Sequence, residues 1–181
     1  MKLAEIVKKY GLSTDKTTGH SYGDFYDAEF ARFRDRPISL LEIGVQFGES
    51  LRMWLEYFPD ALRIYGVDKD TSRIWGTFPD NVVLVKADAY CSKTAEAFGR
   101  LDIIIDDGSH ALIDQIKALR LYLPHLLPGG VLVVEDVQHP DWFPELSAVV
   151  PSGYGHEAIN LRHVKQRSDD LLFVVRNENQ E

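Results

Sequence analysis

The sequence has little cysteine, no long apolar stretch and no concentrated positive charge. Cys91 is its single cysteine, so no disulfide forms within the chain and a reducing, cytoplasmic compartment is expected. No run reaches the ~18 apolar residues that a membrane-spanning helix needs, and the first residues lack the apolar stretch of a signal peptide. We therefore expect neither a membrane partner nor export.

Positive charge is scattered along the chain, whose formal net charge is -8. The short group formed by Arg32, Arg34 and Arg36 is typical of a solvated helix end. Because binding to a phosphate backbone needs clustered lysine and arginine, nucleic acid is not expected as a partner.

The length and composition fit one domain. The 181 residues are 45% hydrophobic, which is enough for one well-packed core and too little for two domains of ordinary size. We expect a single domain over 1–181, made of a helical cap segment at 1–36 and a core at 37–181. Amphipathic helices in 1–34 lie outside that core, and for this reason we expect a homodimer.

From residue 40 onward, short apolar strands alternate with longer amphipathic stretches, which indicates βαβ units and a parallel sheet. The expected strands are 40–45, 64–68, 82–86, 101–106 and 131–135, after a PGG turn at 128–130. The expected helices are 2–10, 24–34, 48–58, 70–76, 92–99 and 111–126. The tail at 158–164 and 171–176 fits two strands joined without a helix. We predict an α/β fold with a Rossmann-like, doubly wound seven-stranded sheet that is mostly parallel and has a C-terminal antiparallel hairpin.

The ends of two strands carry the strongest functional signal. Residues 102–110 read DIIIDDGSH, and residues 133–136 read VVED. If these strands are neighbours in a parallel sheet, three carboxylates and an imidazole converge at one edge, where they suit a hard divalent cation and a general base. The side chains that meet there are Asp107, His110, Glu135 and Asp136. This pattern predicts an enzyme, although each feature alone also fits a strand end or a helix cap.

The loop after the first strand has the features of a nucleotide-binding turn. Gly44 and Gly48 let the backbone turn sharply and approach a ligand, but Gln46 occupies the middle glycine position of the dinucleotide fingerprint. Asp68 ends the second strand about 20 residues later, the spacing at which a carboxylate accepts hydrogen bonds from a ribose diol. Asp88 follows the third strand and would border an adenine. A helix cap or a turn remains the alternative for both aspartates.

Together these motifs resemble class I S-adenosylmethionine-dependent methyltransferases. Within that class, IDDGSH at 105–110 followed by VEDV at 134–137 resembles the metal-dependent sugar O-methyltransferases of the macrocin and mycinamicin type. TDK at 14–16, with His20, Tyr22 and Tyr26, is similar to the segment that those enzymes carry before their first strand. The resemblance covers roughly residues 13 to 138.

The resemblance implies an O-methyltransferase that moves a methyl group from S-adenosylmethionine to a hydroxyl of a sugar or glycoside. The acceptor would be a small molecule or an oligosaccharide with free hydroxyls. His110 would be the general base and Asp107 a second catalytic residue, while Asp107, Glu135 and Asp136 would hold Mg²⁺. We assign nine residues to the cofactor pocket: Lys16, Tyr22, Glu42, Gly44, Gly48, Ser50, Asp68, Asp88 and Asp106.

Three other interpretations keep the fold. A cephalosporin-hydroxylase-like iron enzyme would need two histidines and one carboxylate, and the sequence shows no evident histidine partner for His110. A catechol-type O-methyltransferase would more naturally use a lysine as base, and the loop at 107–110 has none. A nucleotide-binding module without activity would not require the acidic residues and His110 together.

Overall fold

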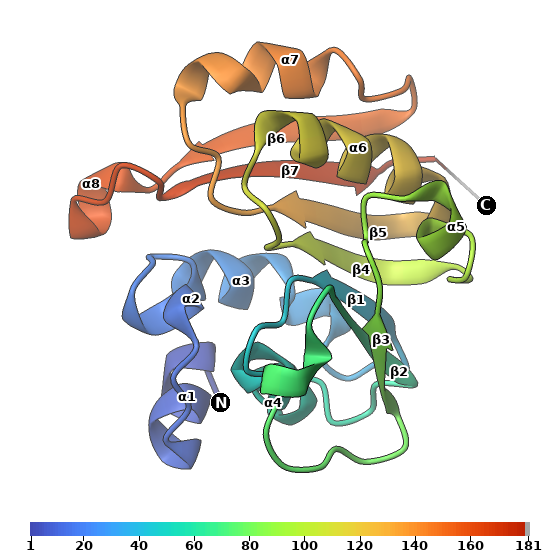
Figure 1. Ribbon diagram of the computed structural model, residues 1–181. Coiled ribbons are helices and arrows are strands. Elements are labelled where there is room, and N and C mark those ends of the chain that lie inside the picture. The colour runs from blue at the N-terminus through green and yellow to red at the C-terminus, as the bar shows by residue number, and fades with distance from the viewer. Residues whose placement is uncertain (180–181) are drawn as a thin grey trace.

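The computed structural model describes residues 1–179 and contains one seven-stranded sheet with helices on both faces (Figure 1). The strand order is β3-β2-β1-β4-β5-β7-β6. The strands are β1 (Ser39–Ile43), β2 (Arg63–Asp68), β3 (Val82–Lys86), β4 (Leu101–Asp106), β5 (Leu126–Val134), β6 (Tyr154–Asn160) and β7 (Leu171–Asn177). Neighbouring strands among β1 to β5 pair in parallel, and β7 runs antiparallel to both β5 and β6. The predicted fold class is confirmed.

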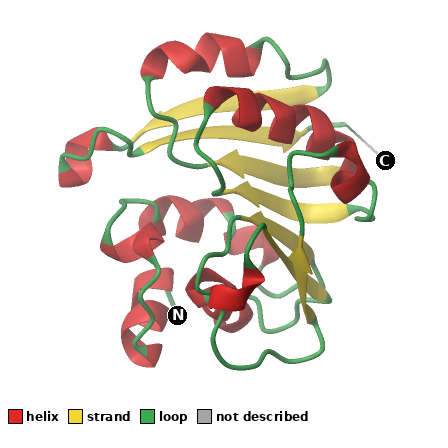
Figure 2. Cartoon of the chain, in the orientation of Figure 1, coloured by secondary structure: helices red, strands yellow, loops and turns green. Residues whose placement is uncertain are grey.

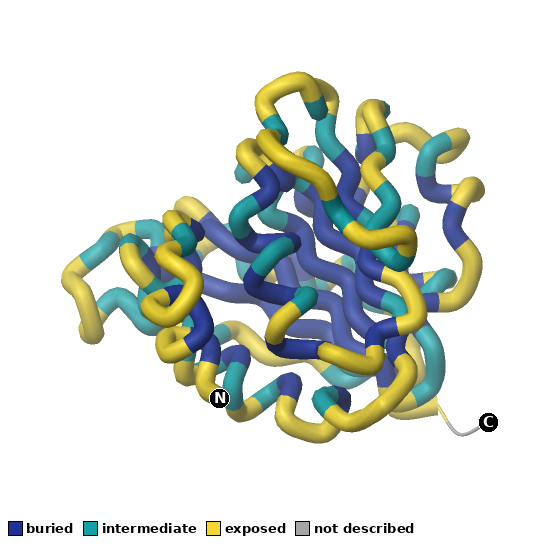
Figure 3. The backbone as a smooth tube through the Cα atoms, turned by 90° about the horizontal axis from the view of Figure 1, so that it is seen from below, coloured by how far each residue is buried: buried dark blue, intermediate teal, exposed yellow. Residues whose placement is uncertain are grey.

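The α-helices form two layers around the sheet, as Figure 2 shows. They are α1 (Leu3–Tyr10), α2 (Asp15–Thr18), α3 (Gly23–Glu29), α4 (Glu49–Tyr57), α5 (Ser92–Ala95), α6 (Leu112–Tyr122), α7 (Phe143–Ser147) and α8 (Arg162–Lys165). Side chains alternate along each strand, so that Leu40 packs in the apolar cluster with α1, α3 and α4, whereas Leu41 packs in the cluster with α5, α6 and α7. Figure 3 shows the resulting buried band along the strands.

The amino-terminal segment packs on the core. Leu3, Ile6 and Val7 are buried in the same cluster as Trp54 of α4. Since the apolar face of α1 is covered within the chain, the observation on which the expected homodimer rested does not hold. Within residues 1–179, no helix has the length and apolarity that crossing a membrane requires.

Three expectations about local structure were wrong. The expected helix at 70–76 is only a 3-10 turn, Thr71–Arg73, which the Asp70 carboxylate caps, because the backbone turns left-handed at Gly76 with a φ of 72°. The strand that was expected to follow the PGG turn at 128–130 instead includes these residues, since β5 begins at Leu126. The two terminal strands form an antiparallel pair as expected, but α8 lies between them, and β6 begins at Tyr154.

Candidate active site

The carboxyl ends of β1, β4 and β5 lie side by side and bring the predicted acidic residues together. Ile43 pairs with Asp106, which in turn pairs with Val134. The ladder continues one step past the strands: the Asp107 N–H donates to the Ile43 carbonyl, and the Glu135 N–H donates to the Asp106 carbonyl, each at 2.9 Å. Asp107 and Glu135 therefore emerge at one edge of the sheet.

Left-handed backbone conformations gather at this edge. Gln46, His110 and Asp136 have φ values of 43°, 56° and 52°. This conformation costs a side-chain-bearing residue roughly 1–2 kcal/mol, and such strain concentrates at functional sites. His110 and Asp136, two of these strained residues, lie in the loops after β4 and β5, where the sequence predicted the site.

Asp107, His110 and Asp136 face one another. His110 Nε2 lies 4.0 Å from Asp107 Oδ1 and 3.7 Å from Asp136 Oδ2. One ligand atom from each of the three residues lies within 4.8 Å of the others, which is close enough to hold one metal ion. The second imidazole nitrogen, His110 Nδ1, is buried and has no hydrogen-bond partner among residues 1–179.

Glu135, the third predicted metal ligand, is directed towards the amino-terminal segment instead. Its Oε1 accepts hydrogen bonds from Lys16 Nζ at 2.8 Å and from the hydroxyl of Tyr26. Lys16 Nζ also lies 2.6 Å from Asp107 Oδ2 and 3.2 Å from Glu42 Oε1. Asp107 and Asp136 therefore face His110, whereas the Glu135 carboxylate lies beside them and contacts the buried ammonium of Lys16.

Lys16 is fully buried and charged. Burial alone would lower the pKa of its ammonium, but Asp107, Glu135 and Glu42 outweigh this effect and raise that pKa well above its usual value. Burial raises the pKa of the Glu135 carboxyl, although Lys16 opposes the shift. Lys16 is therefore the internal counter-ion of the acidic cluster, and it does not line the open cleft to which the sequence assigned it.

Residues of the amino-terminal segment also fix Asp136. The hydroxyl of Tyr22, which we had assigned to the cofactor pocket, donates to Asp136 Oδ1 at 2.5 Å. His20 Nδ1 lies 3.4 Å from the same oxygen and 2.7 Å from Asp170 Oδ1. The roles of His20 and Asp170 were not predicted. The spacing of His20, Tyr22 and Tyr26 was the available signal, but it did not show which strand end each residue contacts.

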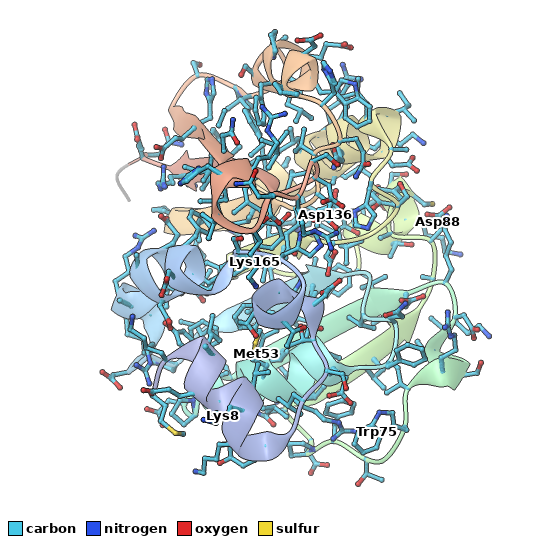
Figure 4. All side chains as sticks on the ribbon, turned by 90° about the vertical axis from the view of Figure 1, so that its left-hand side faces the viewer. Lys8, Met53, Trp75, Asp88, Asp136 and Lys165 are labelled. Carbon is cyan, nitrogen blue, oxygen red and sulfur yellow. The ribbon has the colours of Figure 1, made fainter. Side chains whose placement is uncertain are left out.

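A basic side chain from α8 holds this segment in place. Lys165 Nζ donates to the backbone carbonyls of Thr17 and Thr18 at 2.8 and 3.2 Å. Figure 4 shows Lys165 close to Asp136 in that view, among side chains that converge at the carboxyl edge of the sheet.

A cleft with two compartments lies over the glycine loop. The wide compartment has a volume of about 550 Å³ and contains Asp107 and His110 in its wall. The narrow one, of about 180 Å³, is lined by apolar residues such as Ile43, Val67 and Ala89. Gly44, Asp68 and Gly108 border both compartments and make the cleft continuous.

The nine residues assigned to the cofactor pocket divide into two sets. Gly44, Ser50 and Asp68 line the cleft, and Asp88 lies in the loop beside the narrow compartment, 3.4 Å from Lys69. The others support the walls from outside the open space. These are Lys16, Tyr22, Glu42, Gly48 and Asp106.

Asp68 and Glu42 both stabilise the glycine loop. Asp68 Oδ2 accepts hydrogen bonds from the backbone N–H groups of Val45 and Gln46, each at 3.0 Å. Glu42 is fully buried and accepts a hydrogen bond of 2.7 Å from the hydroxyl of Ser50 at the start of α4. These contacts fix the loop before any ligand enters.

Asp106 supports the narrow compartment through Tyr90, a residue that sequence reasoning missed. Burial raises the pKa of the Asp106 carboxyl to about 7, although a hydrogen bond of 2.8 Å from the Tyr90 hydroxyl opposes the shift. The Tyr90 oxygen also accepts a hydrogen bond from the backbone N–H of Ser109 at 2.9 Å. A Cβ at Gly108 would lie 2.0 Å from that oxygen, so a larger residue there would displace the Tyr90 side chain.

Substituting Gly44 by alanine is expected to lower the free energy of unfolding by roughly 1–3 kcal/mol, measured by urea denaturation. Gly44 has a φ of +80°, and a Cβ there would meet the Asp107 carbonyl oxygen at 2.0 Å. Gly99→Ala is the control, because a Cβ at Gly99 has nothing within 4 Å. Equal denaturation midpoints for the two variants would contradict this account of the loop.

A family model described as a methyltransferase domain matches residues 41–137. The chain is 41% identical over 149 residues to the 8-demethyl-8-alpha-L-rhamnosyl tetracenomycin-C 2'-O-methyltransferase of Streptomyces olivaceus, covering 77% of this chain and 39% of that protein. It is 34% identical to the demethylmacrocin O-methyltransferase of Streptomyces fradiae, covering 77% and 37%. The chain thus spans about two fifths of the length of these relatives.

Among solved structures, the MycE methyltransferase from the mycinamycin biosynthetic pathway, in complex with Mg and SAH, is similar. Its TM-score is 0.67 and its sequence identity 30%, and the match covers 81% of this chain and 39% of that one. These findings confirm the resemblance seen in the motifs. The chain therefore belongs to the family of methyltransferase domains, with sugar O-methyltransferases among its relatives.

Proposed function

We propose that this chain catalyses methyl transfer from S-adenosylmethionine to a hydroxyl of a sugar or glycoside, with Mg²⁺ at the acidic cluster. The observation that carries the proposal is the group formed by Asp107, His110 and Asp136, at the edge of a cleft whose glycine loop is already fixed. The name of the Streptomyces olivaceus relative gives a rhamnosyl compound as its acceptor, which supports a glycosidic acceptor.

The residues of the cleft fit both Mg²⁺ and S-adenosylmethionine. Asp107 and Asp136 offer hard oxygen ligands of the kind that Mg²⁺ prefers, and Glu135, whose Oε1 accepts hydrogen bonds from Lys16 and Tyr26, would be the third acidic residue beside them. The apolar narrow compartment beside Asp68 and Asp88 suits an adenosine. The donor supplies an electrophilic methyl group, and a bound divalent cation supplies the positive charge that makes a hydroxyl more acidic.

Side chains of the protein remove and accept the proton of the acceptor hydroxyl. His110 Nε2 accepts the hydroxyl proton, and Asp107 and Asp136 stand opposite as counter-ions of the imidazolium that forms. Tyr22 fixes Asp136, while Lys16 fixes Asp107 from the protein side. The left-handed backbone at His110 aims the imidazole into the cleft before the acceptor arrives.

The geometry disfavours two of the alternatives. A lysine does lie at the site, but the charge of Lys16 is held by three carboxylates, so it has no lone pair with which to act as the base of a catechol-type enzyme. His20 does lie across Asp136 from His110, which the sequence did not reveal. However, each group of potential metal ligands within residues 1–179 contains only one of these histidines, so no iron site with two histidines and one carboxylate is formed.

The proposal is tested by calorimetric titration with S-adenosylmethionine and by turnover of a simple α-L-rhamnoside with and without EDTA. We expect micromolar donor binding, loss of turnover on chelation and recovery with added Mg²⁺. Asp136→Asn should raise the Mg²⁺ concentration needed for half-maximal turnover. Asp141→Asn is the control, because Asp141 is an exposed aspartate just beyond the site. Turnover that survives EDTA would exclude the metal role, and absence of donor binding would exclude methyl transfer.

A further inference from the structure

The two outer strands of the sheet differ in character. β3 forms one edge and β6 the other (Figure 1). The exposed side chains of β6 include His156, Glu157 and Asn160, and polar groups of this kind discourage an edge strand from pairing with another chain. β3 reads VVLVK, so its only charge is the lysine at its end. The middle of β3 therefore lacks the polar protection that β6 has.

The apolar side chains of β3 are only partly covered. Leu84 is 38% exposed, and Val82, Val83 and Val85 are half-buried. The elements next to β3 in the chain are a 3-10 turn before it and the four-residue α5 after it. Neither is the long crossover helix that usually covers a parallel strand. Exposed apolar surface along an edge strand marks a place where another strand can pair.

The ladder between β2 and β3 shows which backbone groups of β3 point outward. The Asn81 carbonyl accepts a hydrogen bond from the Ile64 N–H, and the Ala87 N–H donates to the Asp68 carbonyl. Backbone groups of successive residues in a strand point to opposite sides, so the odd-numbered residues face β2. The N–H and carbonyl of Leu84 therefore point outward, where no further strand lies within residues 1–179.

Unlike charges lie at the two ends of β3. Asp80 comes just before the strand, Lys86 is its last residue, and both are exposed. Neither forms an ion pair within residues 1–179, whereas the nearby Lys69 and Asp88 lie 3.4 Å apart. A strand that is acidic at one end and basic at the other is complementary to an antiparallel copy of itself.

We propose that β3 is a dimerisation surface, and that its occupant is β3 of a second copy of this chain, paired antiparallel about a twofold axis at Leu84. In this register the outward N–H and carbonyl of Leu84 bond to those of Leu84 in the second copy. Lys86 lies opposite Val82 of the second copy and within reach of its Asp80. The contact uses the same residues on both copies and closes, as twofold interfaces do.

This dimer leaves both clefts open. Each cleft lies at the carboxyl edge of its sheet, and antiparallel copies direct these edges in opposite directions. The inference therefore goes beyond the proposed function, and the failure of either leaves the other standing.

Sedimentation velocity of the full chain, from about 1 µM to about 200 µM, tests the association. We expect the mass to rise from 20.6 kDa towards twice that value, with a dissociation constant in the micromolar range, because one pair of edge strands makes a small contact. A mass of 20.6 kDa at every concentration would overturn the proposal.

Two substitutions at one position test the register. Leu84→Lys and Leu84→Glu each place like charges opposite one another across the axis, and each should weaken association by at least about tenfold. An equimolar mixture of the two should form a heterodimer, which also shows that both variants fold. A mixture that stays monomeric would overturn the proposal, and so would a Leu84→Lys dimer as tight as the unmodified one.

Ile113→Lys is the matched control. Ile113 is an apolar residue that is 60% exposed, but it belongs to α6, which packs on β4 and β5 away from the β3 edge. This variant should associate as the unmodified chain does. Equal loss of association in Ile113→Lys and Leu84→Lys would overturn the assignment to β3.

Discussion

Replacing His110 by asparagine is expected to lower kcat by a factor of about 10²–10⁴, the usual contribution of a general base, while donor affinity changes by less than about twofold. His110 lies in the wall of the wide compartment and is absent from that of the narrow one, which is assigned to the adenosine of the donor. Asparagine keeps a polar group of similar size but accepts no proton at neutral pH. Single-turnover kinetics and calorimetric donor titration measure the two quantities separately.

His125→Asn controls for the removal of an imidazole. His125 is half-buried, and its Nδ1 lies 3.2 Å from the Gly99 carbonyl, before the amino end of β5. It should retain full turnover. Equal kcat in His110→Asn and in the unmodified chain would remove His110 as the base.

The same variant separates a base from a metal ligand. His110 forms one group with Asp107 and Asp136 that is compact enough to hold an ion, so both roles fit its position. If His110 is the base, His110→Asn should bind Mn²⁺, a paramagnetic substitute for Mg²⁺, about as tightly as the unmodified chain does. A loss of Mn²⁺ affinity similar to that of Asp136→Asn would instead make the imidazole a ligand and leave the proton without an acceptor.

The sequence was sufficient to place the acidic strand ends because the argument needed only local patterns and one rule of topology. Buried β-branched runs marked β4 and β5, and parallel neighbours bring their carboxyl ends to the same edge. Asp107 and Glu135 follow directly from that pairing. The turn at Gly44 was predictable in the same way, since a glycine after an apolar strand marks a sharp turn of the backbone.

The directions of these side chains could not be predicted. Glu135 and Asp136 are adjacent, yet one carboxylate points towards Lys16 and the other towards Tyr22. What separates them is the path of a segment more than 100 residues earlier in the chain, together with the left-handed φ of Asp136. Neither leaves a local pattern at the strand end. Long-range packing of this kind also explains why Lys16 was assigned to the cofactor pocket instead of to its supporting wall.

Lys16→Met is expected to lower the free energy of unfolding by about 3–5 kcal/mol, the usual cost of breaking a buried ion pair from one side. Methionine matches the length of the lysine stem but leaves Glu42, Glu135 and Asp107 without their shared ammonium. Glu42 suffers most, because it is fully buried and its remaining hydrogen bond comes from Ser50. Urea denaturation in EDTA measures the loss without interference from metal.

Lys8→Met provides the control for loss of a lysine charge. Lys8 lies on the exposed side of α1, at the periphery in Figure 4, and its substitution should change stability by less than about 0.5 kcal/mol. Equal stability of the two variants would show that the buried ammonium contributes nothing net.

The loss in Lys16→Met should also depend on pH. Burial raises the pKa of Glu42 above its ordinary value even with Lys16 present, and removal of the ammonium raises it further. A carboxyl whose pKa is higher in the folded state binds more protons when folded, so its charge destabilises the fold increasingly as the pH rises above the pKa of the unfolded chain. The difference between Lys16→Met and the unmodified chain should therefore be larger at pH 8 than at pH 5. Adding Glu42→Gln should make this difference in unfolding free energy smaller at both pH values, because the amide removes the buried charge that the lysine had balanced.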